Sequence, residues 1–291
     1  MGTVKRAVLF VNRQRKNSGA ASADIQTELE KRGIETVVYS FEGKPDKPPL
    51  GQWDIAFSLG GDGTVLYTAR CIAPLGVPIL PINLGTLGFI AEVDRNDWLD
   101  VFEKWERGGI MPSRRCMLEV SVERDSKIIM KNICLNDTVI SATGIAKLIK
   151  LDVYLGSSRD GTTLGSYRCD GLIIGTPTGS TAYSMAAGGP ILDPEMEAVI
   201  LNPICPFALS NRPCVLPSQQ PLEVVVADLQ RSKVLLTVDG QDTFNLECMD
   251  RIYIQQAPQP ALLIFADKHA YYSALRNKLF WSGDTLGGVN A

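Results

Sequence analysis

A glycine-rich run with one acid, Gly60-Gly61-Asp62-Gly63-Thr64, has the residue types and spacing of a site for phosphate chemistry. It follows a strand-like segment, residues 54–59, and opens a helix-like segment, residues 64–71. Glycine lets a backbone approach a ligand closely, and the N–H groups at a helix start point at an anion. Because an acid repels phosphate, its presence indicates a shared metal or a polar group to be oriented, as in phosphoryl transfer. A tight turn with a helix cap would use the same residues, and the loop alone does not separate these interpretations.

Two further polar segments stand in apolar surroundings. Asn136 and Asp137 lie inside a strand-like region, where adjacent Asn and Asp are disfavoured. A carboxylate with a neighbouring amide can chelate the vicinal hydroxyls of a ribose, although a plain turn would also accommodate the pair. Residues 175–184 are rich in Gly, Ser and Thr, contain one tyrosine and follow the apolar run 172–174. We interpret them as a ligand loop, because a flexible linker is not usually flanked by such apolar runs.

The bulk composition limits the class of protein and its partners. The chain has 291 residues, enough for one large domain or two ordinary ones. Its 45% hydrophobic and 21% charged residues are typical of a soluble globular protein. A net charge of −3 gives no broad attraction to nucleic acid or anionic membranes, and no apolar run reaches the roughly 20 residues that span a bilayer. We therefore expect a cytoplasmic protein that binds neither nucleic acid nor membrane.

Cysteine and histidine usage restricts the chemistry. The seven cysteines show no C-x-x-C spacing, and the single histidine is His269. A His-based zinc site is thereby excluded and a Ser-His-Asp triad is disfavoured. We expect buried free thiols and a structural His269. The reaction must then use carboxylates, hydroxyls, backbone amides and a metal ion.

The pattern of predicted elements changes along the chain. The first 110 residues alternate strand-like and helix-like segments, which predicts a Rossmann-like α/β domain with a parallel sheet. Its strands are expected near residues 8–11, 36–39, 54–59 and 77–83, and its helices near 23–32, 64–71 and 98–105. From about Arg114, short alternating segments separated by turns predict a second, β-rich domain. A helix is expected at residues 271–281. The glycine-rich loop follows a strand of the first domain, where open α/β sheets bind ligands.

Together these motifs resemble those of the ATP-NAD kinase family. The matching segments are residues 60–64, 83–89, 136–137, 170–171, 176–183, 209–213, 239–241 and 275–281, which cover nearly the whole chain. The first loop also occurs in diacylglycerol and sphingosine kinases and in some phosphofructokinases, but its combination with Thr-Pro-Thr-Gly-Ser-Thr-Ala-Tyr is specific. The resemblance implies an α/β domain, residues 1–112 with about 268–291, and a β-rich NAD-binding domain, residues 113–267. The C-terminal helix would return to the first domain.

The resemblance also implies a reaction and residue roles. The γ-phosphoryl group of ATP would pass to the 2′-hydroxyl of the adenosine ribose of NAD, in a homo-oligomer of two or four chains. Asp62 would be the catalytic carboxylate. The other implied binding residues are Gly61, Gly63 and Thr64 for phosphate, Phe89 for adenine, Asn136 and Asp137 for a ribose, Asp170 near the nicotinamide, and Thr178, Thr181, Ala182 and Tyr183 for the dinucleotide pocket.

Two departures from the family pattern affect these expectations. Asp137 stands where glutamate is commoner and is one methylene shorter, and Phe207 stands where the family often has histidine, so that a polar contact is missing. No lysine stands in the glycine-rich loops to neutralise phosphate charge, so Mg²⁺ or another divalent cation is expected to accompany ATP. Asp62 could act as base, orienter or metal ligand. A lipid kinase with the same loop and a non-catalytic dinucleotide sensor are the alternative functions.

Overall fold

The computed structural model describes residues 4–43, 51–85, 88–144, 147–158, 160–228, 230, 232–267 and 270–279. His269, and Phe280 and Trp281 of the C-terminal motif, lie outside this part of the chain. The chain divides into two compact units, residues Met1–Ser113 with Leu262–Ala291 and residues Arg114–Ala261. Over the described residues, none of the helices has both the length and the hydrophobicity that a membrane span requires.

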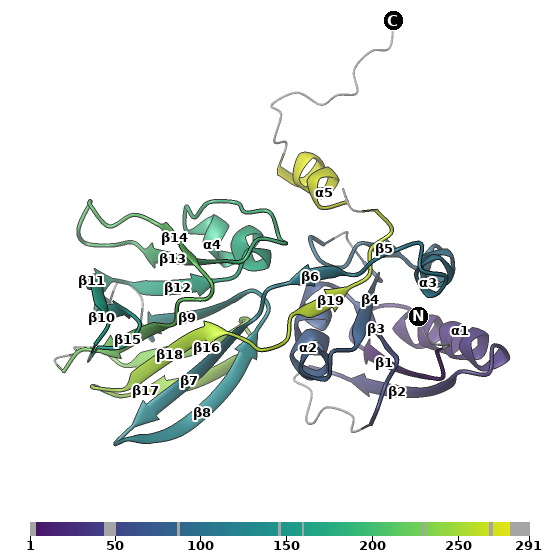
Figure 1. Cartoon of the computed structure of the whole chain (residues 1–291), viewed down its shortest axis with the longest axis horizontal. Helices are drawn as coiled ribbons and strands as arrows, with labels where there is room; N and C mark the ends of the chain where they lie inside the picture. The colour runs from purple at the N-terminus through teal and green to yellow at the C-terminus, as the bar shows by residue number, and fades with distance from the viewer. Residues whose placement is uncertain are drawn as a thin grey trace, which may run out of the picture. The chain divides into compact units, whose positions relative to one another are not determined.

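The first unit is built on a largely parallel sheet, as predicted. In the described residues it has seven strands, in the order β2 (Glu35–Phe41), β1 (Arg6–Asn12), β3 (Ile55–Gly60), β4 (Pro78–Asn83), β19 (Ala261–Leu263) and β6 (Ser113–Arg115), with β5 (Val93–Asp94) paired to β4 (Figure 1). The central strands are continuous apolar runs because both faces of the sheet are covered. Val11 of β1 lies opposite Leu59 of β3, and Gly60 lies opposite Asn83 of β4. The carboxyl ends of these three strands therefore meet at one edge.

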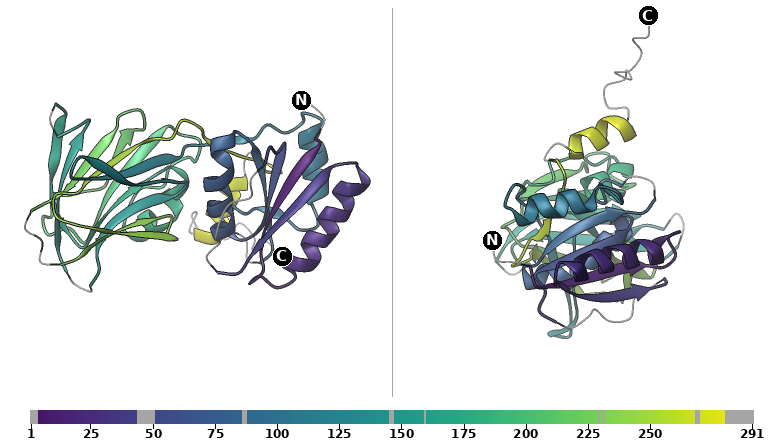
Figure 2. Two further views of the ribbon diagram at one scale, coloured as in Figure 1. Left: turned by 90° about the horizontal axis from the view of Figure 1, so that it is seen from below. Right: turned by 90° about the vertical axis from the view of Figure 1, so that its right-hand side faces the viewer.

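Helices cover both faces of this sheet. Helices α1 (Ser18–Lys31) and α3 (Trp98–Glu106) pack on one face, and α2 (Asp62–Ile72) packs on the other, followed by the short helix η1 (Ala73–Leu75) (Figure 2). Because side chains alternate between the two faces along a strand, aromatic residues of the sheet contact helices on both sides. Phe57 lies 5.8 Å from Trp98 and 5.9 Å from Phe102, between ring centroids, whereas Phe10 contacts Tyr67 of α2 at 5.9 Å.

Helix α1 begins five residues before its predicted start. Its buried face includes Ser18, Ala21 and Ser22 in addition to Ile25 and Leu29. The small residues continue the helical spacing of the apolar ones, but they carry too little hydrophobic signal to mark the first turn in the sequence. The prediction was therefore wrong at this boundary and correct for the helix itself.

The C-terminal helix is present as predicted. Helix α5 (Ala270–Leu279) belongs to the first unit, and it buries Tyr271, Ala274 and Leu275. Spacings of three and four residues place these side chains on one helical face. The polar residues Arg276 and Asn277 are exposed on the remainder of the helix.

The second unit is β-rich, as predicted, and its described strands form two six-stranded antiparallel sheets. One has the order β11 (Thr162–Cys169), β10 (Ile149–Leu155), β15 (Leu222–Val226), β18 (Arg251–Gln256), β7 (Leu118–Arg124) and β8 (Lys127–Cys134). The other has the order β14 (Cys214–Pro217), β13 (Ala198–Ile204), β12 (Gly171–Gly175), β9 (Asp137–Ala142), β16 (Val234–Val238) and β17 (Asp242–Leu246). Side chains of both sheets share one apolar cluster, which places the core of the unit between them.

All seven cysteines are free, as expected, but not all are buried. Cys205 and Cys248 are exposed. Cys205 follows strand β13 in a left-handed conformation with φ 45°, and Cys248 lies in the turn before β18. Their position in turns explains the exposure, which the apolar neighbours in sequence did not reveal.

Candidate active site

The glycine-rich loop joins strand β3 to helix α2. Gly60 ends the strand, Gly61 precedes the helix in an extended conformation, and Asp62 is the first helical residue. The turn is tight, since a Cβ atom added at Gly60 would lie only 2.2 Å from the Thr64 hydroxyl oxygen. That hydroxyl is buried and has no hydrogen-bond partner among the described residues. The loop therefore brings the start of a helix, and a hydroxyl without a hydrogen-bond partner among the described residues, to the carboxyl ends of the strands.

The Asp62 carboxylate binds the backbone of a second loop, which follows β4. The N–H of Phe89 donates to Oδ2 at 3.0 Å, and the N–H groups of Ile90 and Ala91 donate to Oδ1 at 3.2 and 2.9 Å. A carboxylate has about four lone-pair positions, so these three bonds leave roughly one for another donor. The acid of the first loop is therefore held in a fixed orientation by the second loop.

Gly88 is required for this arrangement. A Cβ atom at this position would lie 1.7 Å from Oδ1 of Asp62 and 2.4 Å from its Cγ. Asn83 stabilises the start of the same loop, because its side-chain oxygen accepts the N–H of Gly85 at 2.8 Å. Residues 86 and 87 of the motif lie outside the described part of the chain.

Phe89, predicted to pack on adenine, has a contact of its own. The ammonium group of Lys278 in helix α5 lies 4.6 Å from the centre of its ring, within cation–π distance. The ring is partly exposed. Helix α5 is thereby connected to the loop that holds Asp62, and a ligand on this face of the ring would meet the lysine.

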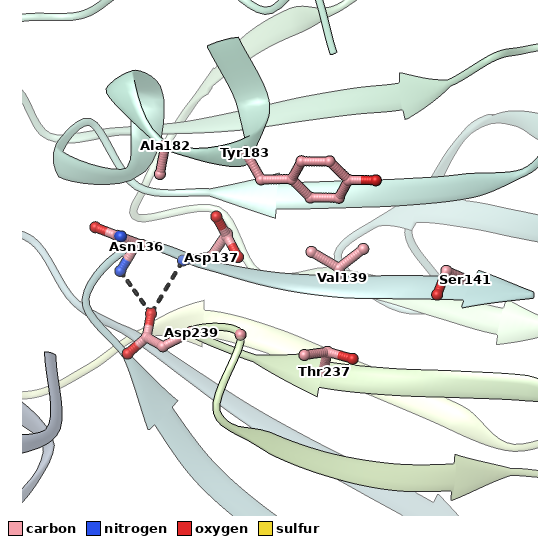
Figure 3. A pocket seen from close by; sticks show the side chains of 9 residues that line it. Asn136, Asp137, Val139, Ser141, Ala182, Tyr183, Thr237 and Asp239 are labelled. Carbon is pink, nitrogen blue, oxygen red and sulfur yellow. Dashed lines mark hydrogen bonds between the residues drawn. The ribbon is translucent and has the colours of Figure 1, made fainter. Parts of the chain in front are cut away.

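Asn136 and Asp137 stand at the start of strand β9 and are held by a third acid, Asp239. The N–H groups of Leu135, Asn136 and Asp137 donate to the Asp239 carboxylate at 3.1, 2.8 and 3.2 Å. Figure 3 shows two of these bonds. Asp239 lies in the turn between β16 and β17 with φ 50°. It plays the same part for this segment as Asp62 plays for the loop after β4.

The Asp137 carboxyl is buried next to another acid. Only 5% of the residue is exposed. Burial, and secondarily the negative charge of Asp239, raise the pKa of Asp137 to about 7. The group therefore changes its charge near neutral pH, whereas an ordinary aspartate is ionised there.

The segment from Thr178 to Tyr183 packs directly on Asn136. It forms the short helices η2 (Thr178–Thr181) and α4 (Tyr183–Ala186). A Cβ atom at Gly179 would lie 2.0 Å from the carbonyl oxygen of Asn136, so only glycine permits this approach. Side-chain oxygens of Asn136 and Thr178 are buried and lack a hydrogen-bond partner among the described residues. Buried polar atoms of this kind normally have partners, which a ligand or water would supply here.

A cavity of about 330 Å³ runs along strand β9 (Figure 3). Four predicted binding residues line it, namely Asn136, Asp137, Ala182 and Tyr183. Sequence reasoning gave no site role to the other lining residues, Val139, Ser141, Thr237, Asp239 and Gly240. Residues 137, 139 and 141 alternate along β9 and so share a face, which the sequence could have indicated once the strand was assigned. Thr237 comes from the neighbouring strand, where it pairs with Val139.

The remaining predicted residues of this unit do not line the cavity. Thr178 and Thr181 are buried, and the Thr181 hydroxyl donates to the Thr178 carbonyl at 3.3 Å. Asp170 precedes Gly171, which pairs with Ser141, whereas Asp137 pairs with Gly175 at the other end of the strands. Asp170 therefore lies beyond the end of the cavity opposite to Asp137.

Phe207 is 67% exposed and stacks against Arg168, with 4.9 Å between the guanidinium and the ring centre.

The donor set for a metal ion is sparse. Among the described residues, no group of three or more His, Cys, Asp or Glu side chains is arranged to hold an ion. Asp62 is the acid at the phosphate-type loop, and three backbone N–H groups already occupy it. A divalent cation that entered with phosphates would therefore draw most of its ligands from phosphate oxygens and water, as Mg²⁺ often does.

Comparisons with known proteins agree with this layout. The family model of the ATP-NAD kinase N-terminal domain matches residues 4–110, and that of the ATP-NAD kinase C-terminal domain matches residues 135–265. An NAD kinase of Treponema denticola is 40% identical over 99% of this chain and 100% of that protein. An NAD kinase of Moorella thermoacetica is 37% identical over 99% of this chain and 93% of that protein.

Two solved structures share the fold. The crystal structure of yeast NADH kinase complexed with NADH has a TM-score of 0.83 at 24% identity, covering 97% of this chain and 90% of that one. An NAD kinase from Archaeoglobus fulgidus in complex with ATP has a TM-score of 0.70 at 24% identity, covering 92% and 96%. The sequence matches define the class of the protein as a phosphotransferase. The chain belongs to the ATP-NAD kinase family.

We predict that Gly88→Ala releases the loop after β4 from Asp62. The added methyl group would collide with the carboxylate. The amides of Phe89, Ile90 and Ala91 should then exchange with deuterium roughly tenfold faster, a change that corresponds to the loss of about one charge-assisted hydrogen bond. Gly19→Ala is the matched control, because a Cβ atom there meets nothing within 4 Å. Hydrogen-exchange mass spectrometry makes the measurement, and equal protection in Gly88→Ala and wild type would contradict the assignment.

We predict that Asp137→Asn stabilises the second unit more at pH 8 than at pH 5. The folded protein retains the Asp137 proton to about pH 7, whereas the unfolded chain releases it near pH 4. Stability is therefore lost as pH rises between these values, and the neutral amide avoids that loss, on the order of 2 kcal/mol between pH 5 and pH 8. Asp125→Asn, at an exposed turn of the same unit, should show no such pH dependence. Urea titration followed by hydrogen exchange of β9 provides the unit-specific readout.

Proposed function

We propose that this chain is an NAD kinase, which transfers the γ-phosphoryl group of ATP to the 2′-hydroxyl of the adenosine ribose of NAD and so forms NADP. The observation that carries the proposal is the 40% identity to an NAD kinase over 99% of this chain and the whole of that protein. The two sites described above supply the parts that the reaction needs. One has a helix start and an acid at a phosphate-type loop, and the other has an acid and an amide beside an elongated cavity.

Asp62 is proposed as the catalytic carboxylate, with orientation of the acceptor hydroxyl as its main task. Its three backbone donors fix both oxygens and leave about one lone pair for the hydroxyl hydrogen. Phosphoryl transfer has a loose transition state, so positioning and charge neutralisation matter more than a strong base. Gly61, Gly63 and Thr64 would contact phosphate through the helix start and the spare Thr64 hydroxyl.

The dinucleotide is proposed to lie along strand β9. Asn136 and Asp137 would bind a ribose at one end of the cavity, and Asp170 would lie near the nicotinamide at the other, an order that the pairing of β9 with β12 supports. Ala182 and Tyr183 would contact the bound molecule, whereas the buried Thr178 and Thr181 would support the segment that carries them. Phe89, whose ring is partly exposed, would pack on adenine.

The remaining parts of the proposal concern the metal, the assembly and the compartment. Mg²⁺ or another divalent cation would accompany ATP and supply positive charge to its phosphates. Phosphate oxygens and water would supply most of its ligands. We further propose a cytoplasmic homo-oligomer of two or four chains, acting without nucleic-acid or membrane partners.

A single assay tests the activity against the alternative functions. The protein is incubated with ATP, Mg²⁺ and NAD, and NADP is measured with an NADP-specific dehydrogenase, with diacylglycerol as the alternative acceptor. NADP formation is expected. Phosphorylation of diacylglycerol alone would indicate a lipid kinase, and NAD binding without product would indicate a sensor, and either result would overturn the proposal.

We predict that Asp62→Asn retains NAD binding and loses most turnover, roughly 100-fold or more, because the amide cannot hold the loop and the acceptor hydroxyl in the same way. Asp97→Asn is the matched control, since this exposed acid also stands at the start of a helix, α3, without a side-chain capping bond. Steady-state kinetics with NAD and ATP give the comparison. A kcat near that of the wild type in Asp62→Asn would remove the proposed role.

A further inference from the structure

Arg15 lies beside the glycine-rich loop although it is distant from it in sequence. It belongs to the connection between β1 and α1. The backbone of this connection is ordered by a turn, in which the N–H of Gln14 donates to the Asn12 side chain at 3.0 Å and the N–H of Arg15 donates to the Asn12 carbonyl at 3.2 Å. Because β1 and β3 are parallel neighbours in register, this connection and the glycine-rich loop leave the sheet at the same edge.

The guanidinium group of Arg15 lies over two glycines of the predicted site. A Cβ atom added at Gly61 would be 3.2 Å from its Nη2 and 3.7 Å from its Cζ, and one added at Gly85 would be 3.8 Å from its Nη1. Gly61 belongs to the loop that carries Asp62, and Gly85 to the loop that Asp62 binds. The guanidinium therefore reaches both loops at once.

The charge of Arg15 has no partner in the part of the chain that the structure describes. Within the described residues its side chain takes part in no hydrogen bond or ion pair, and it is exposed. Arg6, Arg32 and Arg95, which lie in the same unit, each pair with a carboxylate. The nearby acid, Asp62, already accepts three backbone N–H groups. All the guanidinium donors of Arg15 are therefore available to a ligand.

A phosphate group is the ligand that this arrangement fits. The planar fork of a guanidinium donates two parallel hydrogen bonds to phosphate oxygens, and the start of helix α2 adds N–H groups of the same polarity. Phosphoryl transfer requires positive charge at the transferring group, and the two loops, residues 60–64 and 83–89, contain no lysine or arginine. We propose that Arg15 binds the terminal phosphates of the ATP donor and neutralises their charge during transfer. The inference rests on the proposed function and adds a donor-binding residue to it.

The test compares Arg15→Ala and Arg15→Lys with Arg13→Ala as the matched control. Arg13 is exposed in the same connection, and its side chain likewise takes part in no bond within the described residues. We expect Arg15→Ala to raise the KM for ATP roughly tenfold or more and to lower kcat, while the KM for NAD stays unchanged. Arg15→Lys should recover part of the loss, because it restores the charge and not the fork. Arg13→Ala should behave as wild type.

A binding measurement separates this inference from the proposed activity. Inorganic tripolyphosphate should raise the melting temperature of the wild type and of Arg13→Ala, and this shift should vanish in Arg15→Ala, whose melting temperature without ligand should equal that of the wild type. If the wild type forms no NADP, the proposed function fails while the tripolyphosphate result still decides the inference. Unchanged ATP kinetics and an unchanged tripolyphosphate shift in Arg15→Ala would overturn it.

Discussion

The hydrogen bonds between the Asp62 carboxylate and three backbone N–H groups of the loop after β4 organise the phosphate-type site. They fix the orientation of an acid at the start of helix α2, and they hold Phe89 in place through its own N–H. Each bond is charge-assisted and so stronger than one between neutral groups. The absence of a Cβ atom at Gly88 allows the carboxylate to reach the loop at all.

The second unit also uses an aspartate carboxylate to hold the backbone of a distant segment. Asp239 accepts the N–H groups of three successive residues and thereby presents Asn136 and Asp137 at the cavity along β9. The proximity of two acids has a consequence, because burial and the charge of Asp239 raise the pKa of Asp137. In both units the carboxylate of a buried or half-buried aspartate, Asp62 or Asp239, accepts hydrogen bonds from the backbone of a neighbouring segment. Chemistry with anionic substrates then requires cations from elsewhere, which connects this architecture to Arg15 and to a metal that accompanies ATP.

Sequence patterns were sufficient for the architecture. The continuous apolar runs of the first unit and the short alternating segments of the second gave the two kinds of sheet, because burial on two faces and on one face produce different periodicities. The boundary of α1 was missed, since Ser18 and Ala21 are buried but barely hydrophobic. The exposure of Cys205 and Cys248 was missed because turns bring apolar-flanked residues to the surface.

Residues that are neighbours in the sequence are the ones that motifs can group into a candidate site. Asn136, Asp137 and Tyr183 line the cavity, whereas Thr178 and Thr181 are buried and are not among its lining residues. The contribution of Asp239 could not be inferred, because its bonds to residues 135–137 join segments about a hundred positions apart. The proximity of Arg15 to the glycine-rich loop could not be inferred either, because the two segments are far apart in the sequence. Its role depends on the parallel pairing of β1 with β3, which the sequence of the connection does not reveal.

The central claim is that Asp62, held by the loop after β4, orients the acceptor hydroxyl of NAD. A crystal structure of the wild-type protein with NAD and a non-hydrolysable ATP analogue tests it most directly. The account predicts that the adenosine 2′-oxygen of NAD lies within hydrogen-bond distance of the Asp62 carboxylate, about 2.6–3.2 Å, while the three backbone bonds persist. A 2′-oxygen that contacts a different side chain, or an Asp62 carboxylate that has left the backbone of residues 89–91, would contradict it.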